Sequence, residues 1–150
     1  MPQSLVMNYV HITFSTKDRM NLIDEKIEAE LFKYLGGICK TLECQPLIVG
    51  GHQNHVHILC SLSRKIPLMK LIEELKSHSS RWVKNRWEDY NNFYWQKGYG
   101  GFSVNPKQID VVKEYIANQR EHHQKKTFKE EFLSFLHQYD IEYDERYVWD

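Results

Sequence analysis

The sequence lacks several features that would place a protein outside the cytoplasm. No apolar run approaches the ~20 residues that cross a bilayer, and the first residues do not resemble an export signal. Only three cysteines are present, Cys39, Cys44 and Cys60, and none of them has the C-x-x-C spacing. We therefore expect a cytoplasmic protein with reduced thiols and no membrane contact.

The sequence also lacks net charge. Lys and Arg number 20, and so do Asp and Glu, so overall charge gives no sign of a nucleic-acid partner. The distribution is uneven, however, because residues 64–86 contain seven basic and two acidic residues. Such a segment can present a positive face to phosphate, although an ordinary solvated helix surface explains it equally well.

The apolar pattern predicts strands at residues 5–15, 45–49, 55–62, 93–96 and 102–104. Apolar residues at helical spacing predict helices at residues 24–42, 67–83, 106–124 and 127–137, the last begun by a Thr127–Glu130 capping box. This order predicts an α+β fold, a ferredoxin-like or RRM-like sandwich with an antiparallel sheet and helices on one face. We expect residues 1–150 to form a single domain whose other sheet face is open to a partner.

Two histidines stand out in the segment Gly-Gly-His-Gln-Asn-His-Val-His-Ile-Leu at residues 50–59. His55 and His57 are two residues apart on a predicted strand and so share one face, while Val56 and Ile58 point to the other. Neighbouring imidazoles can hold a divalent cation. A His-x-His pair on a strand is nevertheless more often structural than metal-binding.

A second pair of polar residues lies on the helix predicted at 106–124. Tyr115 and Gln119 are four residues apart and share one helix face. The Gln119 carbonyl is a hard oxygen suited to Mg²⁺ or Mn²⁺, and the Tyr115 phenol can attack a metal-polarised phosphate. Packing of Tyr115 on the sheet and exposure of Gln119 would be the commoner outcome for such a pair. His122 and His123 follow closely, and either could replace Gln119 as the third ligand.

These two pairs carry a resemblance to a known family. His55-Val56-His57 resembles the histidine-hydrophobe-histidine motif of the HUH endonucleases. Tyr115-Ile116-Ala117-Asn118-Gln119 resembles the nucleophile helix of their single-tyrosine branch, the IS200-like and REP-associated tyrosine transposases. Further similar segments are spread along the length of the chain, at residues 9–14, 16–19, 50–51 and 95–103. Asn54 departs from the pattern, because many relatives have an acidic residue before the first histidine.

The resemblance implies a transposase that cleaves and rejoins single-stranded DNA at hairpin-bearing ends of a mobile element. It implies that His55, His57 and Gln119 hold Mg²⁺ or Mn²⁺, and that Tyr115 attacks the phosphate to form a 5′-phosphotyrosine intermediate. It also implies a homodimer and no small-molecule substrate. The candidate DNA-binding residues are basic or aromatic, namely Lys17, Arg19, Lys76, Arg81, Lys84 and Tyr99.

Two alternatives remain open on the sequence. One is a domesticated relative that binds hairpin DNA without cleaving it, although the presence of His55, His57, Tyr115 and Gln119 argues against lost catalysis. The other is an unrelated metalloenzyme built on the His-x-His pair. We rank it last, because no carboxylate or further histidine follows within the strand.

Overall fold

The computed structural model of the chain describes residues 2–150. Its centre is an open antiparallel sheet in the order β2-β3-β1-β4, formed by β1 (Tyr9–Ser15), β2 (Gln45–His52), β3 (His55–Ser61) and β4 (Gly100–Ser103). Within these residues the α-helices are α1 (Glu28–Thr41), α2 (Leu68–Arg86), α3 (Ile109–Ala117), α4 (Gln119–His122) and α5 (Phe128–Gln138). The predicted α+β class with an antiparallel sheet is confirmed. No helix in residues 2–150 is long and apolar enough to span a bilayer.

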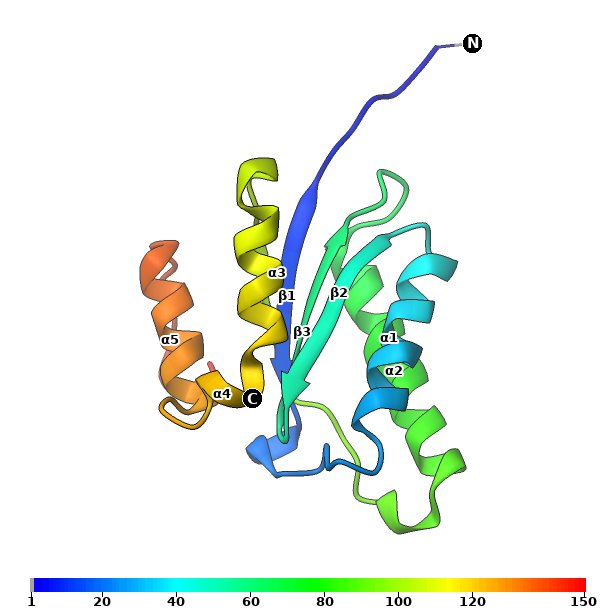
Figure 1. Cartoon of the computed structure of the whole chain (residues 1–150), viewed down its shortest axis with the longest axis vertical. Helices are drawn as coiled ribbons and strands as arrows, with labels where there is room; N and C mark the ends of the chain where they lie inside the picture. The colour runs from blue at the N-terminus through cyan, green and yellow to red at the C-terminus, as the bar shows by residue number, and fades with distance from the viewer. Residues whose placement is uncertain (1) are drawn as a thin grey trace.

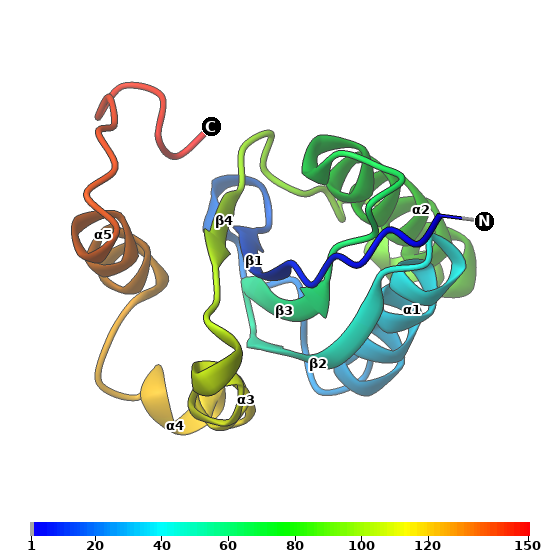
Figure 2. The same ribbon diagram turned by 90° about the horizontal axis from the view of Figure 1, so that it is seen from above.

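Helices lie on both sides of this sheet. Helices α1 and α2 cover one face, where the main hydrophobic core includes Ile12, Val56 and Ile58 (Figure 1, Figure 2). The two helices predicted for one face are therefore found there, but the expectation that the other face is open is wrong. Leu59 packs with residues of α3 on that second face, and Phe102 packs with residues of α5. These apolar side chains require cover, and α3 and α5 provide it.

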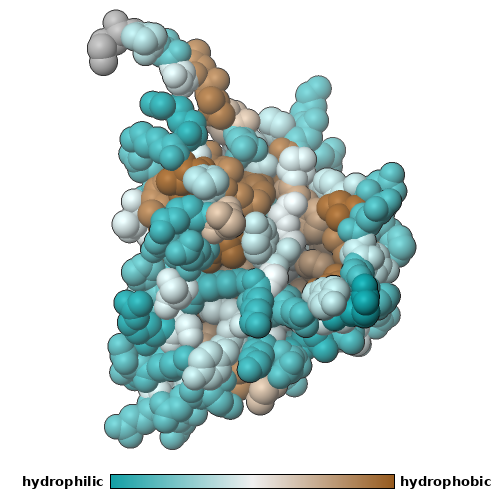
Figure 3. Space-filling view, turned by 180° about the vertical axis from the view of Figure 1, so that it is seen from behind, coloured by the Kyte–Doolittle hydropathy of each residue, from teal (hydrophilic) through white to brown (hydrophobic). Residues whose placement is uncertain are grey.

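Two of the predicted strands, at residues 5–15 and 93–96, need correction. β1 begins at Tyr9, and residues 5–7 form an arm whose apolar side chains are exposed beyond the sheet (Figure 3). The predicted strand at residues 93–96 is reduced to one bridge between Trp95 and Thr16. Beside this bridge, Gln96 N donates to Ser15 O at the end of β1, at 2.9 Å.

The helix predicted at residues 106–124 is divided into three pieces. Residues Pro106–Gln108 form a short 3-10 turn, which begins where the Asn105 side chain accepts from Lys107 N. α3 then ends at Ala117. The next residue, Asn118, has a φ of −98° and a ψ of 22°, which lie outside the helical range, and α4 begins at Gln119. The capping box at the start of α5 is formed as predicted, since both of its hydrogen bonds are present.

Candidate metal and nucleophile site

The histidine pair lies on the second sheet face, beneath α3 and α5. His55 and His57 point to this face from β3 and are fully buried, whereas Val56 and Ile58 belong to the core on the other side. The alternation of side chains along β3 therefore places the histidines on one face and the apolar residues on the other, as the sequence predicted.

A glycine on β2 determines how closely α3 approaches this face. Gly50 pairs with His57 across the β2–β3 ladder. A Cβ atom placed on Gly50 would lie 2.8 Å from Ile116 Cγ2 and 2.9 Å from the Ile116 carbonyl oxygen. Only glycine leaves room for such a close approach of two backbones. As a result, the residues on either side of Ile116 are brought over the histidine pair.

Tyr115 and Gln119 both reach the histidines. Gln119 is buried, and its Oε1 lies 2.9 Å from His55 Nε2. The ring of Tyr115 is partly buried, with its centroid 5.9 Å from that of His57. Gln119 Nε2 also faces the Tyr115 carbonyl at 3.5 Å. The structure thus brings together all four residues that the sequence singled out.

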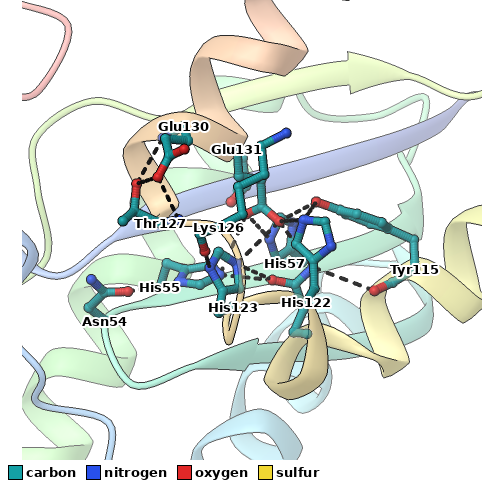
Figure 4. A network of polar contacts seen from close by, with 12 residues as sticks. Asn54, His55, His57, Tyr115, His122, His123, Lys126, Thr127, Glu130 and Glu131 are labelled. Carbon is teal, nitrogen blue, oxygen red and sulfur yellow. Dashed lines mark hydrogen bonds and ion pairs between the residues drawn. The ribbon is translucent and has the colours of Figure 1, made fainter.

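Glu131 and His123 also enter the site, and the sequence did not identify Glu131 (Figure 4). Glu131 Oε1 accepts from His57 Nε2 at 2.8 Å, and Glu131 Oε2 lies 3.2 Å from His123 Nε2. The ligand atoms of His55, His57, His123 and Glu131 all lie within 4.8 Å of one another. This buried group could bind a metal ion. A signal for Glu131 was present, because this carboxylate interrupts an otherwise apolar face of α5.

The hydrogen bonds around the histidines fix which ring nitrogens face the centre. His55 Nδ1 donates to Asn54 Oδ1 at 2.8 Å, and His123 Nδ1 donates to the Lys126 carbonyl at 2.6 Å. A neutral imidazole that donates through Nδ1 presents a lone pair at Nε2. Both Nε2 atoms then face Gln119 Oε1, each at 2.9 Å.

Lone pairs that face one another repel unless a cation lies among them. Asn54 Nδ2 donates to the Arg19 carbonyl and Gln119 Nε2 donates to Glu131, so neither amide can be turned without loss of a hydrogen bond. Metal-binding histidines typically donate their other ring N–H to an oxygen acceptor, as His55 and His123 do here. The donor set of imidazole nitrogens, an amide oxygen and a carboxylate therefore fits a divalent cation.

Burial and charge set the ionisation of the site. Burial, followed by the neighbouring His57, holds the pKa of His55 well below its ordinary value, which keeps the ring neutral and able to bind metal. Burial alone would raise the pKa of Glu131, but the charge of His57 and the hydrogen bond from His57 hold this pKa well below its usual range. Burial and then the charge of Glu131 raise the pKa of Tyr115, so its hydroxyl keeps its proton.

Two further histidines border the site. His11 on β1 is buried, and its Nε2 is joined to His57 Nδ1 by a 2.8 Å hydrogen bond. This hydrogen bond orients the His57 ring. His122 Nε2 lies 3.3 Å from the Tyr115 hydroxyl and is not among the four clustered ligands. Between the two histidines considered as alternative ligands, the structure therefore favours His123.

The candidate DNA-binding residues do not form one surface. Lys17 and Arg19 lie in the turn after β1, which contacts Asn54 beside the histidine pair. Arg81 and Lys84 lie on α2, on the opposite side of the sheet (Figure 2). Two of the six, Lys76 and Tyr99, contact one another at the loop before β4, residues 96–99.

At that loop the Lys76 ammonium group is already engaged. It donates to the backbone carbonyls of Gln96, Lys97 and Gly98 at 2.7, 3.1 and 2.6 Å. It also lies 5.8 Å from the centroid of the Tyr99 ring. Lys76 therefore holds the loop in place in this structure.

One comparison with known proteins identifies a family, and another identifies solved structures with the same fold. A family model described as "Transposase IS200 like" matches residues 4–119. A proposed transposase from Deinococcus radiodurans R1 has a similar structure, with a TM-score of 0.61, 17% identity, and coverage of 79% of this chain and 98% of the other. A REP-associated tyrosine transposase bound to a REP hairpin has a TM-score of 0.60 at 12% identity, with coverage of 82% and 73%. At these identities the two structures show a common fold. The comparison with curated protein sequences gives no match.

Proposed function

Because the chain belongs to the family of IS200-like transposases, we propose that it cleaves and rejoins single-stranded DNA with Tyr115 as its nucleophile. The observation that carries this proposal is the convergence of Tyr115, Gln119, His55 and His57 at one site. They come from separate elements, β3 on one side and α3 and α4 on the other. A nucleophile beside a set of metal donors is the arrangement that phosphoryl transfer through tyrosine requires.

The proposed cofactor is Mg²⁺ or Mn²⁺. We assign His55, His57 and Gln119 as ligands, and Glu131 and His123 lie close enough to complete the set. A divalent cation bound there would polarise the scissile phosphate and stabilise the charge on its non-bridging oxygens. His11 and Asn54 would hold His57 and His55 in orientation through their hydrogen bonds.

The proposed reaction has two balanced steps. The Tyr115 oxygen bonds to phosphorus as its O–H bond breaks, the bond from phosphorus to the 3′ oxygen breaks, and the released 3′ oxygen takes up a proton. The 5′ end of the DNA is then joined to Tyr115. A 3′ hydroxyl of another strand later reverses these steps, and no external energy source is needed because the phosphodiester energy is retained.

The proposed DNA substrate is a strand with a hairpin near the end of an element. A structural neighbour is bound to a REP hairpin, which supports this choice. Lys17 and Arg19 adjoin the site and are the better placed candidates for phosphate contacts, whereas Arg81 and Lys84 would be reached only by DNA that passes around the sheet edge. We also propose a homodimer, on the family resemblance, with its mass in solution as the test.

Replacement of the nucleophile tests the proposed function. Labelled single-stranded DNA taken from the sequences that flank the gene is incubated with protein and Mn²⁺, and adducts are resolved on a denaturing gel. We expect an adduct with the wild type and none with Tyr115→Phe, while hairpin affinity changes less than about threefold. Tyr147→Phe, at an exposed tyrosine of the tail, serves as the matched control. An adduct formed by Tyr115→Phe would overturn the assignment.

A non-catalytic hairpin-binding protein is the alternative that one observation favours. The Tyr115 hydroxyl is held by Glu131, and its pKa is raised, so the phenol is a poor nucleophile without a cation. Under this alternative the wild type would bind hairpin DNA and never nick it, with either Mg²⁺ or Mn²⁺ present.

A further inference from the structure

Helix α5 contributes to the site although it lies beyond the matched family segment. That segment ends at residue 119, whereas α5 begins at Phe128. The helix packs on β4 through Phe128 and Phe132, and the same face carries Glu131, which is 2% exposed. A carboxylate is rarely buried on an apolar face without several polar partners. The partners of Glu131 therefore indicate what it does.

The two oxygens of this carboxylate face different halves of the site (Figure 4). Oε1 faces the histidine pair, at 2.8 Å from His57 Nε2 and 3.6 Å from His55 Nε2. Oε2 accepts hydrogen bonds from the Tyr115 hydroxyl and from Gln119 Nε2, the latter at 3.2 Å. One side chain thus joins the donors for the cation to the proposed nucleophile.

We propose that Glu131 is a positioning residue whose carboxylate holds the Tyr115 hydroxyl against the metal-binding donors. The role in the reaction rests on the proposed function, whereas the contacts of Glu131 are observed whatever the function is. A partly buried phenol on α3 would otherwise rotate about its side-chain torsions. Attack on phosphorus needs a defined position, and a displacement of about 1 Å can cost roughly 100-fold in rate.

The carboxylate is tested by Glu131→Gln and Glu131→Asp. Glutamine keeps the size of the side chain but replaces one acceptor oxygen with a donor, so it cannot serve both halves of the site. Aspartate keeps both acceptors on a shorter stem. Glu130→Gln is the matched control, because Glu130 is the adjacent exposed residue and glutamine also satisfies a capping box.

Mn²⁺ affinity is measured by calorimetry without DNA, and single-turnover adduct formation is measured at saturating Mn²⁺ and DNA. For Glu131→Gln we expect Mn²⁺ affinity to fall at least ~10-fold, as for other groups that orient metal ligands. We expect the adduct rate to fall ~100-fold with DNA affinity unchanged. Glu131→Asp should recover part of the rate, and Glu130→Gln should match the wild type in both measurements.

Thermal unfolding, recorded for every variant, separates these effects from a loss of folding. If Glu131→Gln is destabilised yet keeps the wild-type Mn²⁺ affinity and adduct rate at a temperature where it is folded, the residue is only structural and the inference is overturned. Faster adduct formation by Glu131→Gln would overturn the inference too, because the hydrogen bond from Tyr115 to Glu131 would then slow the attack on phosphorus. If the wild type itself forms no adduct, the proposed function fails, and the Mn²⁺ affinities alone decide whether Glu131 belongs to the metal site.

Discussion

Replacement of Gly50 by alanine should separate the nucleophile from the histidines without touching either. The new Cβ would lie 2.9 Å from the Ile116 carbonyl, and ordinary contacts begin at 3.4 Å, so α3 must move by about 0.5 Å. Because Tyr115 is on this helix, we expect adduct formation to fall roughly 10- to 100-fold. Overpacking of this kind lowers the free energy of unfolding by about 1–3 kcal/mol. Alanine also restricts the unfolded chain more than glycine does, which offsets part of this loss.

The assay combines adduct formation under single-turnover conditions with the free energy of unfolding in urea. Gly37→Ala is the matched control, because a Cβ there meets nothing within 4 Å and the residue lies inside α1. In Gly37→Ala the free energy of unfolding should rise by about 0.5–1 kcal/mol, and the rate of adduct formation should equal that of the wild type. Adding Ile116→Ala to Gly50→Ala should restore little of the lost adduct rate, because the alanine Cβ at position 50 still overlaps the backbone carbonyl of residue 116. A Gly50→Ala protein with wild-type rate and stability would refute the close approach of α3 to β2.

Two other predictions concern the surroundings of the site. Lys76→Met should destabilise by about 1–3 kcal/mol, because three loop carbonyls lose a charged donor, yet should leave the salt dependence of hairpin binding unchanged. Any loss of salt dependence in hairpin titrations would show that Lys76 contacts phosphate. Burial lowers the pKa of His11 to about 3, so the unfolded chain binds a proton that the folded chain excludes between pH ~6.5 and about 3. Without metal, the free energy of unfolding should therefore fall as pH drops through this window, by at most ~1.4 kcal/mol per pH unit, and His11→Gln should reduce the slope in urea titrations.

The four strands of the sheet and most helices could be predicted because they depend on local periodicity, whereas the strand predicted at residues 93–96 is only one bridge. β3 is the clearest case, since alternation alone places His55 and Val56 on opposite faces. The break at Asn118 could not be predicted, because residues 117–124 contain no proline or glycine that would mark a helix end. The cover of the second sheet face by α5 depends on contacts between Phe102 and a helix far along the chain, and no local pattern reports such a contact.

The candidate site shows the same division between local and distant information. His55, His57, Tyr115 and Gln119 were identified by spacing and resemblance. Glu131 was missed because it lies 74 residues from His57 in the sequence, and local spacing does not connect residues so far apart. For the same reason no carboxylate was expected near the histidines, and the metalloenzyme alternative ranked last. The structure places a carboxylate, Glu131, beside the histidines. The metalloenzyme alternative is therefore set aside by the match to the transposase family and not by the lack of a carboxylate.

The position of the Tyr115 hydroxyl depends on two restraints of different kinds. The absence of a side chain at Gly50 sets the distance between α3 and the sheet, which fixes the backbone of Tyr115. The hydrogen bond to Glu131 then fixes the rotation of its side chain. The first restraint lies inside the matched family segment and the second lies beyond it, on α5. Residues 4–119 alone would therefore bring the tyrosine near the metal donors, whereas the C-terminal helix determines where its oxygen points.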